Sequence, residues 1–354
     1  MVSIVQIGYG NAARIHRDSL KKEGIDIDVL GVIEINPNKI KDAEKEGFKV
    51  FRSIDEYFTK YGKTPDFFDN CTPTKEHYWV TKKILEHTPD ANILIEKPVT
   101  SPEYISLIRE LIKYHPKARI SVNENYISSN VTRVIKEKAE EYGFSTPEID
   151  VEFTKNRVED VLNGRFIDKD LGALGYEGSH ELAVVRGIFD DNLPDRIEDA
   201  MLDDMVLPDG TILKEQGSAE ILFDTNNGCK VDLFSSMIGK IKFHIDEFNP
   251  PKTISIGEKT RYRIISLAEG DIRIIGQFEP VEGYERGKGR VYVSKGDNII
   301  EKIEGIRDNN MGQHIKEVIK YFNGEIDNPS PVDDATVFVK KLCEAVKIAR
   351  SKKV

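Results

Sequence analysis

Two hydrophobic patterns divide the chain. In residues 1–123, short apolar runs alternate with longer stretches whose apolar residues recur at helical spacing. The runs predict strands at residues 2–7, 28–33, 48–51, 67–71, 93–95 and 120–122. The stretches between the strands predict helices, including 12–22, 37–46 and 76–86. Strands that alternate with helices are typical of a doubly wound parallel sheet, the α/β class to which the Rossmann fold belongs.

From residue 148 onward the pattern changes to period-two alternation with few helices between the strands. Strands are predicted at 148–153, 219–223, 230–234, 262–265 and 290–293. Turn sequences such as Asn226-Asn227-Gly228 indicate hairpins, and therefore a large, mostly antiparallel open sheet in an α+β domain. Flanking helices are predicted at 130–142, near 180, at 313–322 and at 333–350. We therefore predict two domains, 1–123 and 124–354.

The first strand ends in a glycine turn, Gly8-Tyr9-Gly10-Asn11-Ala12-Ala13. A strand before and a helix after it is the context that the dinucleotide-binding fingerprint requires. In that fingerprint Gly8 allows the tight turn, Gly10 lets the backbone approach a pyrophosphate, and Ala13 permits close helix–strand packing. The amino end of the helix, at Asn11 and Ala12, then offers N–H groups to the phosphates.

The second strand ends at Glu34, close to the ~20-residue separation from the glycines that is expected for a ribose-binding acid. A carboxylate there accepts hydrogen bonds from ribose hydroxyls and repels a 2′-phosphate. The sequence therefore favours NAD over NADP. Lys39 supports the alternative, because a nearby cation would accommodate the extra phosphate.

An apolar strand at 93–95 runs directly into Glu96, Lys97 and Pro98. Ligands of parallel sheets bind beyond the carboxyl ends of the strands. The strand ends at 8–13, 34, 72–74 and 96–98 are therefore expected to face one crevice.

These motifs resemble those of the Gfo/Idh/MocA oxidoreductase family, which includes glucose-fructose oxidoreductase and inositol dehydrogenase. The matching elements are the glycine turn with His16, then Glu34, Thr72-Pro73 with His77, and Glu96-Lys97-Pro98. The resemblance implies that Thr72, Pro73, His77, Glu96 and Lys97 contribute to the cofactor site, to which we also assign Asn125. It further implies that Lys97 acts on the substrate hydroxyl, and that the Lys97–Pro98 bond is cis. We expect the Glu96 carboxylate to point away from the Lys97 amine.

The second half resembles the family motif Gly-Gly-x-Leu-x-Asp-x-Gly-x-His over residues 171–180. His180 falls on the active-site histidine of the family, whereas Tyr176 replaces the aspartate. Glu177 or the Tyr176 hydroxyl is left to take the role of that aspartate. In the preceding loop, Arg157 and Arg165 are candidates to donate to hydroxyls or to a carboxylate of a ligand.

Composition narrows the function further. A net charge of −10 over 354 residues argues against nonspecific nucleic-acid binding. The three cysteines, Cys71, Cys229 and Cys343, are far apart and predict neither a disulfide framework nor a zinc site. No cluster has metal-ligand spacing, so no metal is expected.

The start lacks a secretory leader and no apolar run reaches the ~20 residues of a membrane span, which together predict a cytoplasmic protein without a membrane partner.

The resulting interpretation is an NAD(P)-dependent oxidoreductase that moves a hydride between nicotinamide and a secondary alcohol or ketone of a sugar, cyclitol or related polyol. Lys97 is the candidate acid/base group, with His180 or Tyr176 as its partner. Two alternatives stay open: an NAD-dependent glycosidase and a non-catalytic dinucleotide-sensing regulator of the same fold. We also expect a homodimer or homotetramer formed through the second sheet, since Ile221, Leu222 and Phe223 place apolar residues on both of its faces.

Overall fold

The computed structural model describes residues 1–165, 167–189 and 193–353. They form two compact units, which we describe separately. Unit 1 comprises Met1–Ser128 and Asn309–Val339, and unit 2 comprises Ser129–Asp308 and Lys340–Val354. The predicted domains divide the chain once, after residue 123, whereas the observed units divide it three times. Phe166, within the predicted ligand loop, lies outside the described residues.

Unit 1 is built on a six-stranded sheet whose paired strands are all parallel. The strands are β1 (Val2–Ile7), β2 (Ile27–Ile33), β3 (Val50–Phe51), β4 (Phe67–Asn70), β5 (Asn92–Ile95) and β6 (Arg119–Val122). Their order, β3-β2-β1-β4-β5-β6, is that of the Rossmann fold, with the reversal of strand order at β1. The predicted fold class of the first domain is thereby confirmed.

Helices and short 3₁₀ turns connect these strands. They are α1 (Asn11–Lys22), α2 (Pro37–Lys45), α3 (Ile54–Lys60), η1 (Thr74–Glu76), α4 (His77–His87), η2 (Pro102–Tyr104), α5 (Ile105–Tyr114) and η3 (Asn125–Ser128). Local sequence explains their starts. Asn36 caps α2 with Pro37 in its first turn, and the Ser53 side chain accepts a hydrogen bond from the Glu56 N–H at the start of α3.

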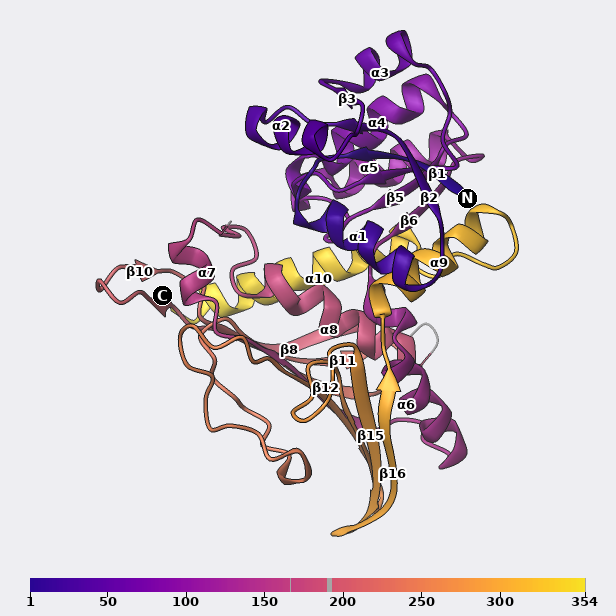
Figure 1. Cartoon of the computed structure of the whole chain (residues 1–354). Helices are drawn as coiled ribbons and strands as arrows, with labels where there is room; N and C mark the ends of the chain where they lie inside the picture. The colour runs from indigo at the N-terminus through magenta and orange to yellow at the C-terminus, as the bar shows by residue number, and fades with distance from the viewer. Residues whose placement is uncertain (166, 190–192, 354) are drawn as a thin grey trace. The chain divides into compact units, whose positions relative to one another are not determined.

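Two helices from the end of the chain complete unit 1. Helix α9 (Asn310–Phe322) packs against α1, and the first part of α10 (Val332–Ser351) follows it (Figure 1). Ile315, Val318 and Phe322 of α9 join one hydrophobic cluster with residues of the sheet and of α1. The other buried members of this cluster are Ile4, Leu20, Phe67 and Leu94. The core of unit 1 is therefore made from both ends of the chain.

The carboxyl ends of the parallel strands meet, as the sequence predicts. Backbone hydrogen bonds continue past the strands from Cys71 N to Ile7 O, from Glu96 N to Asn70 O and from Asn123 N to Ile95 O. The Lys97–Pro98 bond that follows β5 is cis, which confirms that prediction.

Unit 2 contains an eight-stranded sheet in the order β16-β15-β14-β13-β7-β12-β11-β8. All neighbouring strands are antiparallel except β7 and β12. The strands are β7 (Glu148–Thr154), β8 (Pro194–Leu202), β11 (Ser218–Thr225), β12 (Lys230–Ser236), β13 (Tyr262–Glu269), β14 (Ile272–Gln277), β15 (Lys288–Lys295) and β16 (Asn298–Arg307). A separate two-stranded sheet pairs β9 (Met205–Val206) with β10 (Ile212–Leu213). The predicted mostly antiparallel sheet is confirmed.

One face of this sheet carries helices, as expected. They are α6 (Asn130–Glu141) and α8 (Leu174–Ile188), and the shorter elements of the unit are α7 (Val158–Leu162) and η4 (Asp246–Phe248). The side chain of Ile135 on α6 fills the space beside Gly276, while Glu181 on α8 accepts a hydrogen bond from the Phe153 N–H. Ile221 and Phe223 are 2% exposed.

The opposite face is partly covered by the chain itself. Residues Ile241, Ile245, Phe248 and Ile254 form a cluster with Tyr262, Ile264, Ile275 and Tyr292 of the sheet. Leu222, on this side, is only half-buried, and its strand neighbour opposite is Asp232. This face is therefore more polar than the run of apolar residues at 221–223 predicts. Among the described residues, no helix has the length and hydropathy of a membrane span.

Candidate functional site

The glycine turn has the geometry of a phosphate-binding turn. Gly8 has a φ of 88°, and a Cβ placed on it would lie 2.8 Å from the Cys71 carbonyl oxygen. Gly10 is the extended N-cap of α1, where none of the described side chains caps the helix. The first-turn N–H groups, at Asn11 and Ala12, are therefore available to the pyrophosphate of a dinucleotide.

Glu34 is already engaged at the end of β2. Its carboxylate accepts hydrogen bonds of 2.8 Å from the backbone N–H groups of Tyr9, Ile35 and Asn36, and the residue is 7% exposed. The carboxylate thus fixes the glycine turn against β2. Whether it also receives ribose hydroxyls remains a prediction.

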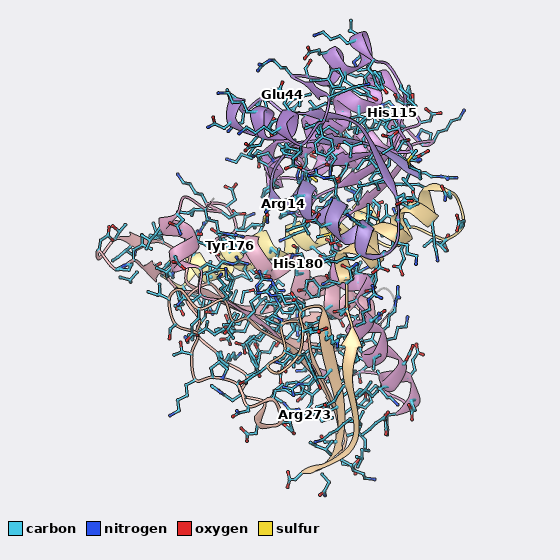
Figure 2. The ribbon with its side chains drawn as sticks, in the orientation of Figure 1. Arg14, Glu44, His115, Tyr176, His180 and Arg273 are labelled. Atoms are coloured by element: carbon cyan, nitrogen blue, oxygen red, sulfur yellow. The ribbon has the colours of Figure 1, made fainter. Side chains whose placement is uncertain are left out.

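A cavity of about 460 Å³ lies beside the turn, lined by Gly10, Arg14, Lys39 and other residues (Arg14 is labelled in Figure 2). The Lys39 ammonium is 3.7 Å from the position that a Cβ on Gly10 would occupy. Cations at this point suit the phosphates of either dinucleotide.

Beyond the carboxyl ends of β4 and β5, a buried histidine joins two carboxylates. His16 Nδ1 lies 3.0 Å from Asp69 Oδ1, and His16 Nε2 lies 2.8 Å from Glu96 Oε1. Burial opposes a charged imidazole, yet the Asp69 carboxylate raises the pKa of His16 well above its usual value. Burial likewise opposes ionisation of Glu96, but hydrogen bonding and charge from His16 lower its pKa to about 2. We conclude that His16 is an imidazolium that pairs with the ionised carboxylate of Glu96.

Glu96 accepts two further hydrogen bonds, from the Asn123 side-chain amide and from the Lys97 backbone N–H, the latter at 3.2 Å. These bonds fix the Glu96 carboxylate toward His16.

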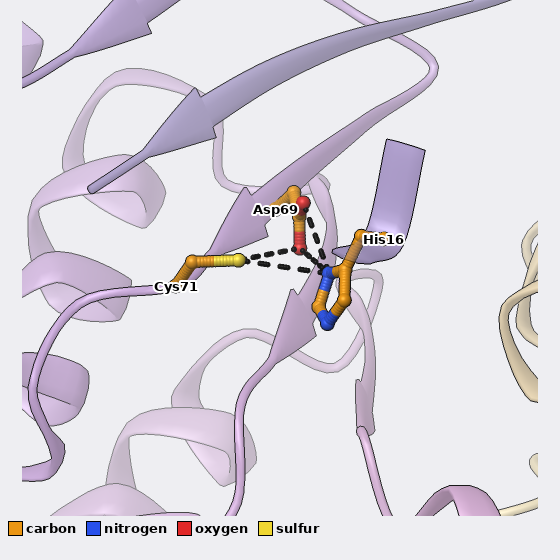
Figure 3. A group of neighbouring side chains, drawn as sticks. All are labelled: His16, Asp69 and Cys71. Carbon is orange, nitrogen blue, oxygen red and sulfur yellow. Dashed lines mark hydrogen bonds and ion pairs between the residues drawn. The ribbon is translucent and has the colours of Figure 1, made fainter. Parts of the chain in front are cut away.

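Cys71 lies against the same pair (Figure 3). Its sulfur is 3.4 Å from Asp69 Oδ1 and 3.6 Å from His16 Nδ1. Among the described residues, His16, Asp69 and Cys71 are a group whose potential metal-ligand atoms lie within 4.8 Å of one another. Sequence spacing missed it, because Asp69 is 53 residues from His16. Burial raises the pKa of the Cys71 thiol, and a metal would bind here only with loss of the thiol proton and of a His16 proton. In this structure the three side chains form a hydrogen-bonded cluster.

The remaining cofactor candidates of unit 1 lie around two turns. His77 is buried, with Nε2 2.8 Å from the Thr72 carbonyl oxygen and Nδ1 2.9 Å from the Pro98 carbonyl oxygen. It therefore links the Thr72-Pro73 turn to the Lys97–Pro98 turn. Asn125 is 5% exposed, and within the described chain its side-chain oxygen has no hydrogen-bond partner.

The candidates of unit 2 lie at the start of α8 (Tyr176 and His180 are labelled in Figure 2). Residues 176 and 180 share a helix face because they are four positions apart. The Tyr176 hydroxyl donates to Gln216 Oε1 at 3.3 Å, and burial raises the pKa of Tyr176. Glu177 is buried and forms ion pairs with Arg157 and, at 3.4 Å, with Arg263. Glu177, one of the two candidates for the role of the family aspartate, is therefore held in ion pairs with arginines.

The predicted ligand loop lies against this helix. Arg157 pairs with Asp160 at 3.2 Å as well as with Glu177, and the Arg165 guanidinium lies over the Tyr176 ring, 5.4 Å from its centroid. Sequence reasoning did not identify Arg261 and Arg263, about a hundred residues away, because only the pairing of β7 with β13 brings them to this end of the sheet.

The sequence of unit 1 matches a known family. Residues 2–124 match a family model described as "Oxidoreductase family, NAD-binding Rossmann fold". Among curated proteins, none matches the sequence.

Solved structures resemble the whole chain at low identity. An oxidoreductase of Desulfitobacterium hafniense, provisionally named as NADPH-dependent, has 13% identity and a TM-score of 0.76, covering 99% of this chain and 96% of its own. UDP-N-acetylglucosamine 3-dehydrogenase of Acidithiobacillus ferrooxidans has 16% identity and a TM-score of 0.70, covering 98% and 97%. The WlbA dehydrogenase of Bordetella pertussis, in complex with NADH and UDP-GlcNAcA, has 14% identity and a TM-score of 0.69, covering 99% and 97%.

These likenesses establish a shared fold over both units. The family motifs in the sequence, the strand order of unit 1 and the match over residues 2–124 agree with one another. Residues 2–124 therefore match the Gfo/Idh/MocA oxidoreductase family, whose NAD-binding Rossmann fold unit 1 carries.

Proposed function

We propose that the protein is an NAD-dependent dehydrogenase that oxidises a secondary alcohol of a sugar, cyclitol or related polyol, or reduces the corresponding ketone. The observation that carries the proposal is the position of Lys97, directly after β5 in the same unit as the glycine turn. Structural neighbours that are sugar-nucleotide dehydrogenases, or that hold NAD or NADH, support the substrate and cofactor class.

The residues present fit a dinucleotide. The Gly8–Ala13 turn and the amino end of α1 would hold its pyrophosphate, and Glu34 would face the adenosine ribose. When bound, the nicotinamide supplies the hydride acceptor at its C4 atom. The other roles fall to the chain itself, which positions the alcohol and removes its proton.

Lys97 is assigned the hydroxyl proton. A lysine acts as a base only when its amine is neutral, and a bare carboxylate beside it would favour the ammonium form. The imidazolium of His16 balances the charge of Glu96, so that carboxylate attracts an ammonium less strongly than an unpaired one. Lys97 would take the proton from the substrate oxygen, and His180 and Tyr176 stay the candidates for a second acid/base group. Proton transfer of this kind contributes ~10²–10⁴-fold to a rate.

The experiment is a panel of polyols, sugars and cyclitols incubated with the purified protein and NAD, with nicotinamide reduction as the readout. Reduction that depends on one substrate class supports the proposal. Glycoside cleavage with NAD retained and no net reduction would indicate the glycosidase. NAD binding without turnover of any member would favour the sensor.

The Tyr176→Phe variant then tests whether the Tyr176 hydroxyl or His180 has the acid/base role. It removes the hydroxyl that donates to Gln216 and keeps the ring beneath Arg165. We expect turnover to fall about tenfold or more if the hydroxyl replaces the aspartate of the family. Unchanged turnover would leave the role to His180.

A further inference from the structure

The end of the unit 2 sheet that lies next to α8 gathers positive charge. Lys155 and Arg157 follow β7, and Arg261 and Arg263 lie at the start of β13. Thr154 pairs with Tyr262 in the ladder, so the two pairs of cations meet at the same end of the sheet. Arg165, between α7 and α8, adds a fifth.

Carboxylates of the described chain balance only part of this charge. Asp160 pairs with Lys155 at 2.7 Å and with Arg157 at 3.2 Å. Glu177 pairs with Arg157 and Arg263. Glu279 is 3.9 Å from both Arg261 and Arg263, at the limit of an ion pair. Within the described part of the chain, these three carboxylates lie within ion-pair distance of four of the five cations.

Two donors in this group are uncommitted. Among the described residues no carboxylate pairs with Arg165, whose contact is the ring of Tyr176. The Nε–H group of Arg157 is buried and, within the described part of the chain, has no hydrogen-bond partner. Burial and the nearby Arg157 lower the pKa of Arg165, as expected for guanidinium groups held close together without a full set of counter-charges.

We propose that these arginines bind an anionic group of the substrate, a carboxylate or a phosphate, with Arg165 and Arg157 as its principal donors. Guanidinium groups donate in pairs to such oxyanions, and the hydrogen bonds are about twice as strong as neutral ones. A cavity of about 250 Å³ lies on the Lys155 and Arg261 side of this group, and its lining also includes the carboxylates Glu159, Asp160 and Glu258.

The position also suits a substrate that reaches His180. Arg165 lies over Tyr176, and His180 follows Tyr176 by four residues of α8, a rise of about 6 Å along the helix. We therefore infer that one small molecule contacts Arg165 through its anionic group and His180 through a hydroxyl. This inference rests on the proposed function and narrows its substrate to acidic sugars, sugar phosphates or sugar nucleotides.

The test compares a neutral sugar with its charged counterparts. Glucose, glucuronate and glucose 6-phosphate are titrated into the NAD-loaded protein by calorimetry, and nicotinamide reduction is followed in parallel. We expect a charged ligand to bind at least about tenfold more tightly than glucose. Carboxylate and phosphate are separated by which of the two charged sugars binds. Equal binding of all three, or tighter binding of glucose, would overturn the inference.

Arg165→Gln carries the mutational arm, because it leaves both arginine partners of Glu177 in place, whereas Arg157→Gln would remove one of them. It should weaken binding of the charged ligand about tenfold more than binding of glucose and leave NAD affinity within a few-fold. Arg196→Gln, which removes an arginine that is 68% exposed in the same unit, is the matched control and should change neither. An equal loss in both variants would refute a specific site.

The two proposals fail in different ways. If Arg165→Gln weakens anion binding but no ligand leads to nicotinamide reduction, the anion site is supported and the dehydrogenase proposal is rejected. Reduction driven by neutral polyols alone would retain the dehydrogenase and reject the anion site.

Discussion

Replacing Glu96 by glutamine tests whether the His16 cluster is ionised. The amide keeps the shape of the side chain and an oxygen for His16 Nε2 and the Asn123 amide, but it removes the negative charge. Asp69 remains as the carboxylate beside the imidazolium. The free energy of unfolding should therefore fall, because removing one partner of a buried ion pair strongly destabilises the folded protein.

The magnitude follows from the pKa of Glu96, which His16 lowers from 4.5 to about 2. One pKa unit is worth about 1.4 kcal/mol, so the ionised carboxylate contributes about 3 kcal/mol at pH 7. Because the folded pKa lies below the unfolded one, this stabilisation is complete above about pH 4.5 and is lost as the pH falls toward about 2. Near pH 3, less than half of it should remain.

Urea unfolding of the wild type and of Glu96→Gln, at pH 7 and at successively lower pH, measures this difference. Glu110→Gln, an exposed glutamate on α5, is the control and should stay within about 0.5 kcal/mol of the wild type. The conclusion that the cluster is ionised would be wrong if Glu96→Gln had the same free energy of unfolding as this control at pH 7. It would also be wrong if the loss of stability relative to the wild type did not decrease on acidification.

Four further predictions concern the cofactor, the chemistry and the assembly. Lys97→Ala should leave NAD affinity within a few-fold and lower turnover by ~10²-fold or more, while Lys117→Ala, an exposed lysine of unit 1, keeps full activity. NAD should bind at least about tenfold more tightly than NADP in parallel titrations, and equal affinities would remove Glu34 from the ribose site. Gly8→Ala should lower the melting temperature and NAD affinity more than Gly24→Ala; both glycines have positive φ, but only at Gly8 does a Cβ meet a carbonyl oxygen, at 2.8 Å. We also propose that the eight-stranded sheet mediates association, so sedimentation at micromolar concentration should show a dimer or tetramer; a monomer would contradict this.

The sequence predicted the parts of the fold that depend on local pattern. Apolar runs, the glycine turn and the Ser53 cap define strands, turns and helix starts through short-range physics. The parallel arrangement of the strands in unit 1 followed from the alternation of strand and helix. The cis Lys97–Pro98 bond was expected from the family resemblance alone.

Other features depend on contacts between residues far apart in the chain. The period of α9 predicts an apolar face but does not say that this face covers α1. Similarly, an acid at a strand end can face a ligand or accept backbone N–H groups, and Glu34 does the latter. One signal was available and missed. Asp69 and Asn70 are polar residues in a strand that is buried throughout, which points to internal hydrogen-bond partners such as Gln6 and His16.

The contribution of α9 to the core of unit 1 bears on how the protein is made. During synthesis the Rossmann strands leave the ribosome early, but Ile4, Leu20, Phe67 and Leu94 lack their α9 partners until the chain has been translated past Phe322. Contacts over such sequence separations slow folding and keep apolar surface exposed to chaperones and to other nascent chains. The dinucleotide-binding half therefore completes its core only when nearly the whole chain has been made, although it is encoded first, and a fragment ending at residue 128 would expose the surface that α9 normally covers.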